Sequence, residues 1–277
     1  MLIDGDNAGH SSLKQIIEEV SRYGDVTVRR AYGDWTQPDL ANWRPVMLAH
    51  AIQPIQQWRY TTGKNATKNA TDSALIIDAM DILYSGTVQG FCVVSSDSDY
   101  TRLCTRIRES GLFVMGIGRA TTPESLVKAC NVFVYVENLI PPDEMKEPDA
   151  INTTAEPKTP AEPKAVVEPK SPTVSKAPAE AKTPAKDKPV TTTTTPASSR
   201  KKLLNLLRRA FDLTAQDDQV WVNLGALGNV LRRLEPSFDS RTYGFKSLTL
   251  LITSMPEHIE VKNANKSGTS ARMKAAK

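Results

Sequence analysis

The sequence has 277 residues, of which 40% are hydrophobic and 24% charged, so it can bury a core and has room for about two domains. Its net charge of +4 is too small to mark the whole chain as a polyanion binder. It holds no long apolar run and does not open with a signal peptide, so we expect neither a membrane nor a secreted protein but a soluble, cytoplasmic one.

The first 140 residues alternate between strand-like and helix-like patterns. A short apolar run, residues 1–3, ends in Asp4, and Leu13, Ile16 and Val20 share one face of the helix that follows. Further strands are expected at 25–33, 54–62, 90–96, 112–118 and 132–138, and helices at 11–24, 39–52, 72–86, 100–111 and 122–130. Apolar strands alternating with helices predict an α/β domain, residues 1–140, with a parallel sheet covered on both faces.

Residues 141–200 lose this periodicity. They are rich in proline, threonine, alanine and lysine, and "EPK" recurs at positions 156, 162 and 168. We expect a disordered, extended linker. A docking site for proline-binding modules is the alternative for this segment.

Helical periodicity returns at residue 201, and residues 201–263 read as helices followed by a strand, an order that fits a small winged-helix domain. Residues 264–277 hold four basic residues and no acidic ones, and we expect a basic disordered tail. Three scattered cysteines, Cys92, Cys104 and Cys130, fit reduced core positions.

Acidic residues cluster where apolar strands end. Asp4 and Asp6 follow the first strand, Asp97 and Asp99 follow the strand near residue 94, and Asp72 opens a helix. Residues two apart on a strand face the same way, so each Asp-x-Asp pair can aim both carboxylates at one point. Such crowding is costly without a cation, and Mg²⁺ or Mn²⁺ prefers oxygen ligands. Capping of its helix is the alternative role for Asp72.

Several motifs together resemble the NYN domain, a branch of the PIN-like metal-dependent ribonucleases. They are "LIDGDNA", "RRAYGDW", "KNATDSALIIDAMDILY", "VVSSDSDYTRL" and "GIGRATTPESLVKACNVFVYVENL". The resemblance implies a catalytic set of Asp4, Asn7, Asp72 and Asp97. It also implies that Asp4, Asp72, Asp97 and Asp99 bind Mg²⁺ or Mn²⁺. The chain departs from the family by having only three residues ahead of Asp4.

Phosphodiester cleavage is the reaction that this resemblance implies, with Arg29, Arg30 and Lys64 as contacts to the nucleic-acid backbone. Solvated charge at strand ends is the alternative for the two arginines. Haloacid-dehalogenase-type phosphotransferases also begin with a strand and Asp-x-Asp, but they expect a hydroxyl residue and a glycine soon after, and "DGDNAGH" fits that poorly.

The C-terminal stretch "SRTYGFKSLTLLI" resembles the LOTUS domain, also called OST-HTH, a winged-helix family associated with RNA and with protein partners. Arg241, Tyr243 and Lys246 are its candidate RNA contacts, although Tyr243 also fits a core position. We therefore expect a ribonuclease, an endoribonuclease, whose LOTUS domain holds RNA. The alternative is an RNA-binding adaptor with a weak or inactive nuclease fold.

Overall fold

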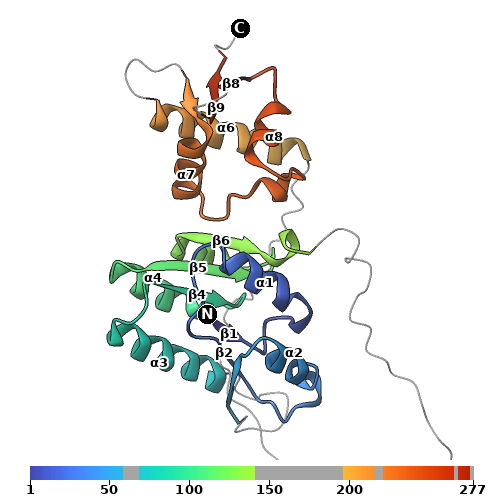
Figure 1. Cartoon of the computed structure of the whole chain (residues 1–277), viewed down its shortest axis with the longest axis vertical. Coiled ribbons are helices and arrows are strands. Elements are labelled where there is room, and N and C mark those ends of the chain that lie inside the picture. Colours follow the sequence, from blue (N-terminus) through green and yellow to red (C-terminus); the bar gives the residue numbers. More distant parts are fainter. Residues whose placement is uncertain (59–68, 141–195, 216–220, 265–267, 275–277) are drawn as a thin grey trace, which may run out of the picture.

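The computed structural model describes residues 1–58, 69–140, 196–215, 221–264 and 268–274 (Figure 1). The expected linker lies outside these ranges except at its end, where helix α6 begins at Pro196 and not after residue 200. Proline is well placed there, because its fixed φ suits the first turn of a helix.

Six parallel strands form the N-terminal sheet in the order β3-β2-β1-β4-β5-β6. They are β1 (Leu2–Asp4), β2 (Arg30–Gly33), β3 (Gln53–Gln56), β4 (Gly90–Val94), β5 (Phe113–Gly118) and β6 (Val132–Tyr135). The helices are α1 (Leu13–Val20), α2 (Trp43–Ala49), α3 (Asn69–Ser85), α4 (Thr101–Glu109) and α5 (Glu124–Ala129), with short 3-10 turns η1 (His10–Ser12), η2 (Pro38–Leu40), η3 (Ser98–Tyr100) and η4 (Val136–Asn138).

Two apolar clusters lie on the two faces of this sheet. One face packs against α3, α4 and α5 through residues such as Leu75, Leu103 and Leu126. The other packs against α1 and α2 through residues such as Ile16 and Trp43. Figure 1 shows these helices on opposite sides of the strands, which confirms the predicted parallel sheet covered on both faces.

The C-terminal domain combines helices with a small antiparallel sheet. Its elements are α6 (Pro196–Thr214), β7 (Val222–Asn223), α7 (Leu224–Leu234), the 3-10 turn η5 (Ser240–Tyr243), α8 (Leu248–Thr253), β8 (Ile259–Ala264) and β9 (Gly268–Met273). The strand order is β7-β9-β8. Asn223 caps α7 by accepting a hydrogen bond from the Gly225 N–H.

Strand β9 corrects one prediction. Residues 268–273 were expected within a disordered tail, but they pair with both β7 and β8. Ala271 of this strand is fully buried in the domain core. The prediction was wrong because this short polar segment has little strand signal of its own, and its pairing with β7 and β8 decides its structure.

Two further observations concern the whole described chain. Its three cysteines are free and buried, as predicted. Among the described residues, no helix is both long enough and apolar enough to cross a bilayer.

Candidate metal centre

The candidate site lies at the carboxyl ends of β1 and β4, neighbours at the middle of the sheet. The chain winds outward from this pair in both directions, toward β3 on one side and β6 on the other. In open α/β sheets, ligands bind at the point where the strand order reverses. The acids predicted from the sequence follow these two strands.

Asp4 ends β1 and is fully buried. Its carboxylate accepts hydrogen bonds from Asn7 Nδ2 at 2.7 Å, from Ser95 Oγ at 2.8 Å and from the Asp6 N–H at 3.2 Å. Burial nevertheless raises the pKa of Asp4 above its usual range, because it disfavours the charged form more than these bonds support it. Asn7 thus positions Asp4 directly.

Three other carboxylates converge beside this position. Asp72, Asp97 and Asp99 each offer an oxygen, and these oxygens lie within 4.8 Å of one another. Asp72 lies in the first turn of α3, and the other two come from the connection between β4 and α4. Asp4 is not in this group of three; it is fully buried, and its charge is close enough to raise the pKa of Asp72.

The expected Asp-x-Asp geometry is formed by turns and not by strand alternation. β1 ends at Asp4, so Asp6 lies in the following turn, where its carboxylate accepts a hydrogen bond from Thr71 Oγ1 at 3.1 Å. Asp97 caps the 3-10 turn η3 and accepts from the Asp99 N–H at 3.0 Å. The same-face argument for paired strand residues therefore does not apply to either pair.

Two neutral residues that the sequence analysis missed connect these acids. Ser95, at the end of β4, donates to Asp4 and accepts from the Asp97 N–H at 3.0 Å. Tyr100 is fully buried and donates its hydroxyl to Asp72 Oδ1 at 2.7 Å. Both stand within "SSDSDY", so their closeness to the acids in sequence was the available signal.

The electrostatics of the cluster favour a cation. Burial raises the pKa of Asp72 above its usual range, and the hydrogen bond from Tyr100 opposes this. The negative charges of Asp4, Asp97 and Asp99 raise it further. Since carboxylate oxygens are the donors that Mg²⁺ and Mn²⁺ prefer, the residues present fit such an ion.

The predicted basic contacts lie elsewhere. Arg30 opens β2, at the opposite end of the strand from the acidic edge, and pairs with Asp78 at 2.7 Å. Arg29 donates to the His50 carbonyl at 3.0 Å. Lys64 lies outside the described residues. The role of the two arginines in RNA contact stays a prediction, but the structure does not bring them to the acidic cluster.

Of the predicted RNA contacts in the C-terminal domain, Arg241 contacts the N-terminal domain and Lys246 lines a cavity shared with it, whereas Tyr243 packs against the core of its own domain. Arg241 pairs with Asp239 and with Glu19 of α1. Tyr243 packs against the core and lies 6.3 Å from Phe238 between ring centroids.

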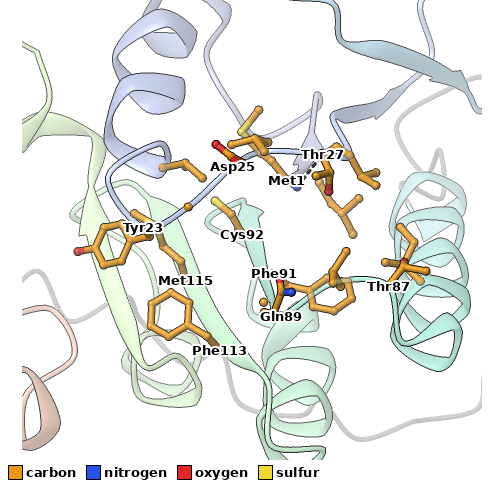
Figure 2. A pocket seen from close by; sticks show the side chains of 18 residues that line it. Met1, Tyr23, Asp25, Thr27, Thr87, Gln89, Phe91, Cys92, Phe113 and Met115 are labelled. Carbon is orange, nitrogen blue, oxygen red and sulfur yellow. Dashed lines mark hydrogen bonds between the residues drawn. The ribbon is translucent and has the colours of Figure 1, made fainter.

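A cavity of about 520 Å³ lies at the opposite, amino edge of the sheet (Figure 2). Tyr23 and Phe113 line it and stack with ring centroids 5.7 Å apart, and Cys92 and Met115 line it as well. None of the clustered acids lines this cavity. The candidate site is therefore defined by its carboxylates and not by the volume of a pocket.

Fold and cluster together define an α/β protein with a candidate cation site at the carboxyl edge of a parallel sheet. Residues 1–137 match the NYN domain family, and residues 194–270 match the OST-HTH/LOTUS domain family. The chain therefore contains an NYN domain followed by a LOTUS domain, as the motifs indicated.

Comparison with solved structures and with curated proteins gives less information about this chain than the two family matches. A protein of unknown function from Vibrio parahaemolyticus is similar at 17% identity and a TM-score of 0.41, covering 48% of this chain and 89% of that one. An uncharacterized protein from Nitrosomonas europaea is similar at 26% identity and a TM-score of 0.25, covering 36% of this chain and 91% of that one. No curated protein matches the chain.

Proposed function

We propose that this protein is a cytoplasmic, metal-dependent ribonuclease that cuts RNA internally, and that its LOTUS domain holds the RNA. The observation that carries this proposal is the group formed by Asp72, Asp97 and Asp99 beside buried Asp4. Membership of the NYN family, whose fold belongs with PIN-like nucleases, supports it.

The cluster suits phosphodiester hydrolysis. Asp72, Asp97 and Asp99 would hold one or two Mg²⁺ or Mn²⁺ ions, which when bound would acidify a water molecule and neutralise charge on the departing oxygen. Tyr100 fixes the rotation of the Asp72 carboxylate through its hydroxyl. Asp99 is exposed, so the cluster opens to solvent, where an RNA strand can reach it.

Asp4 has a different part in this proposal. It is fully buried and accepts hydrogen bonds from Asn7 and Ser95. Ser95 also accepts from the Asp97 N–H, so it links Asp4 to the loop that carries Asp97. We therefore propose that Asn7 and Ser95 position Asp4, and that Asp4 places negative charge close to the ion.

Cleavage of labelled RNA by the full chain tests the proposal. We expect activity with Mg²⁺ or Mn²⁺ and none in EDTA. A covalently closed circular RNA should also be cut, since internal cleavage needs no end. Asp97→Asn keeps the cap of η3 but removes ligand charge, and it should lower the rate about a hundredfold or more.

The matched control is Asp81→Asn. Asp81 lies exposed on α3, the helix that carries Asp72, so the change in charge is the same while the cluster stays intact. Full activity of Asp97→Asn, or of the unaltered chain in EDTA, would remove the nuclease assignment. A chain that binds RNA tightly yet cuts it with neither metal would be an RNA-binding adaptor.

A further inference from the structure

The LOTUS domain contacts the NYN domain at the outer edge of its sheet, where β6 is the last strand (Figure 1). Four polar contacts span α1, α5, β6 and η4. They are Glu19 to Arg241 at 3.1 and 3.2 Å, Lys128 Nζ to Glu235 at 2.5 Å, the Phe133 N–H to the Pro236 carbonyl at 2.9 Å, and Asn138 Nδ2 to Thr242 Oγ1 at 2.8 Å.

Glu19 and Arg241 form the best-defined of these contacts. Both terminal nitrogens of the guanidinium reach the two oxygens of Glu19, a bidentate geometry that fixes orientation as well as distance. Glu19 is only 5% exposed. Glu19 also pairs with Arg22 at 3.2 Å, so it keeps a charged partner when the domains separate; the two-point geometry to Arg241 is what selects one docked arrangement.

The edge of the sheet adds a backbone contact. A parallel edge strand presents unpaired N–H groups, which proteins commonly cover. The Phe133 N–H of β6 finds its acceptor in the Pro236 carbonyl, and Pro236 itself is buried. Residues 235–242 of the LOTUS domain therefore cover part of the β6 edge.

The same segment carries the turn expected to hold RNA. The Arg241 guanidinium already donates to Asp239 and Glu19, so an RNA phosphate at those nitrogens must displace a carboxylate. Lys246 lines a cavity of about 580 Å³ at the seam, together with residues of α1 and β6. Docking and RNA binding thus require the same face of the turn.

We propose that the α1–β6 edge of the NYN domain is an internal docking surface for residues 235–242, and that RNA and this edge compete for Arg241. This rests on the proposed RNA-holding role of the LOTUS domain. Residues 141–195 tether the two domains, so docking is intramolecular and few contacts are enough to populate it. RNA that gains its contacts only in the open state shifts the population toward that state.

Glu19→Arg tests the docking surface without altering a proposed RNA contact. It opposes Arg241 with like charge, so the radius of gyration of the full chain in small-angle scattering should rise before any RNA is added. RNA affinity, titrated in EDTA to prevent cleavage, should increase. The gain equals the reciprocal of the open fraction, about tenfold if nine-tenths of the molecules are docked.

Glu18→Arg is the matched control, because Glu18 is the exposed neighbour of Glu19 on α1. The change in charge is the same, so any nonspecific attraction of RNA to the added positive charge is the same in both variants. A second set excludes misfolding. Lys128→Glu and Glu235→Lys should each open the molecule, and the double variant, with the pair reversed, should restore both the compact scattering and the weaker RNA binding.

Unchanged scattering of Glu19→Arg would overturn the docking surface. An extended Glu19→Arg chain that binds RNA no better than Glu18→Arg would overturn the competition. Adding Lys246→Ala to the Glu19→Arg variant tests the proposed RNA-holding role of the LOTUS domain separately from the docking of the two domains. We expect weaker binding and a smaller salt dependence, by about 0.7 in slope for a lost single-strand phosphate contact. No change there would remove the RNA-holding role while leaving the scattering result standing.

Discussion

At the scale of single residues, two acids at the carboxyl edge of the sheet contrast sharply. Asp34 follows β2 and is buried; burial acts to raise its pKa, but donors from Thr36, Gln37 and Gln56 hold that pKa below its usual range. Asp72 has one such donor and several like charges, and its pKa is raised. Hydrogen bonds stabilise the charged form of Asp34, whereas a bound cation would stabilise the charged form of Asp72.

Tyr100 gives a residue-scale prediction. Tyr100→Phe removes the hydroxyl that holds Asp72 while the buried ring keeps its packing. Loss of a residue that orients a ligand typically costs about 10–100-fold in metal affinity or activity. We expect a fall of that size in Mn²⁺ affinity by calorimetric titration, and a parallel fall in RNA cleavage.

Tyr84→Phe is the control for this change, because Tyr84 is 72% exposed and accepts only a 3.4 Å hydrogen bond from Arg106. Its Mn²⁺ affinity should match that of the unaltered chain. Equal affinity of Tyr100→Phe would mean that the hydroxyl contributes packing alone.

Sequence reasoning identified the acids of this site better than their surroundings. Motif resemblance named Asp4, Asp72, Asp97 and Asp99, and all four lie at one edge of the sheet. The sequence did not identify Ser95, Thr71 or Tyr100 as site residues. A neutral hydroxyl gives no sequence signal of such a role, because the role depends on the acid that the fold places beside it. Arg30 was predicted to contact nucleic acid, but in the structure it pairs with Asp78, which is 48 residues away in sequence.

At the scale of elements, apolar runs predicted the strands, but their ends depended on local geometry. β1 is only three residues long, so alternation could not describe the acids after it. The sequence predicts a helix that starts at Asp72, yet α3 begins at Asn69. That extra turn brings Thr71 to Asp6, a contact between segments 65 residues apart.

Gly116 supplies an element-scale prediction. A Cβ there would lie 2.4 Å from Phe133 Cδ2 and 2.8 Å from Cys130 Sγ, so β5 and β6 pack around its missing side chain. Gly116→Ala should destabilise the NYN domain by about 1–3 kcal/mol, the usual cost of overpacking. The measurement is the midpoint of urea-induced unfolding of the NYN domain, compared with that of the unaltered chain.

Gly9→Ala is the comparison for that variant. A Cβ at Gly9 meets nothing nearer than 3.8 Å, and its φ of −89° suits alanine. Its urea midpoint should stay close to that of the unaltered chain. If the two variants unfold at the same midpoint, the close packing around Gly116 relaxes at little cost.

At the scale of the whole molecule, composition located the two domains but not the contact between them. The break in periodicity and the proline-rich segment were visible in the sequence. The pairing of Glu19 with Arg241 was not, since it joins residues 222 positions apart and depends on both folds at once. The C-terminal limit was also misjudged, because β9 was taken for a tail.

That strand leads to the last prediction. β9 is the middle strand of β7-β9-β8, so a chain ending at Asn263 would leave β7 and β8 with no partner between them. It would also remove Ala271 from the core. We therefore expect the truncated chain to lose the thermal transition of its LOTUS domain, while the NYN transition persists. A chain ending at Lys274 keeps β9 and should melt like the full protein. Equal melting of both truncated chains would mean that the helices α6, α7 and α8 hold the domain together without the sheet.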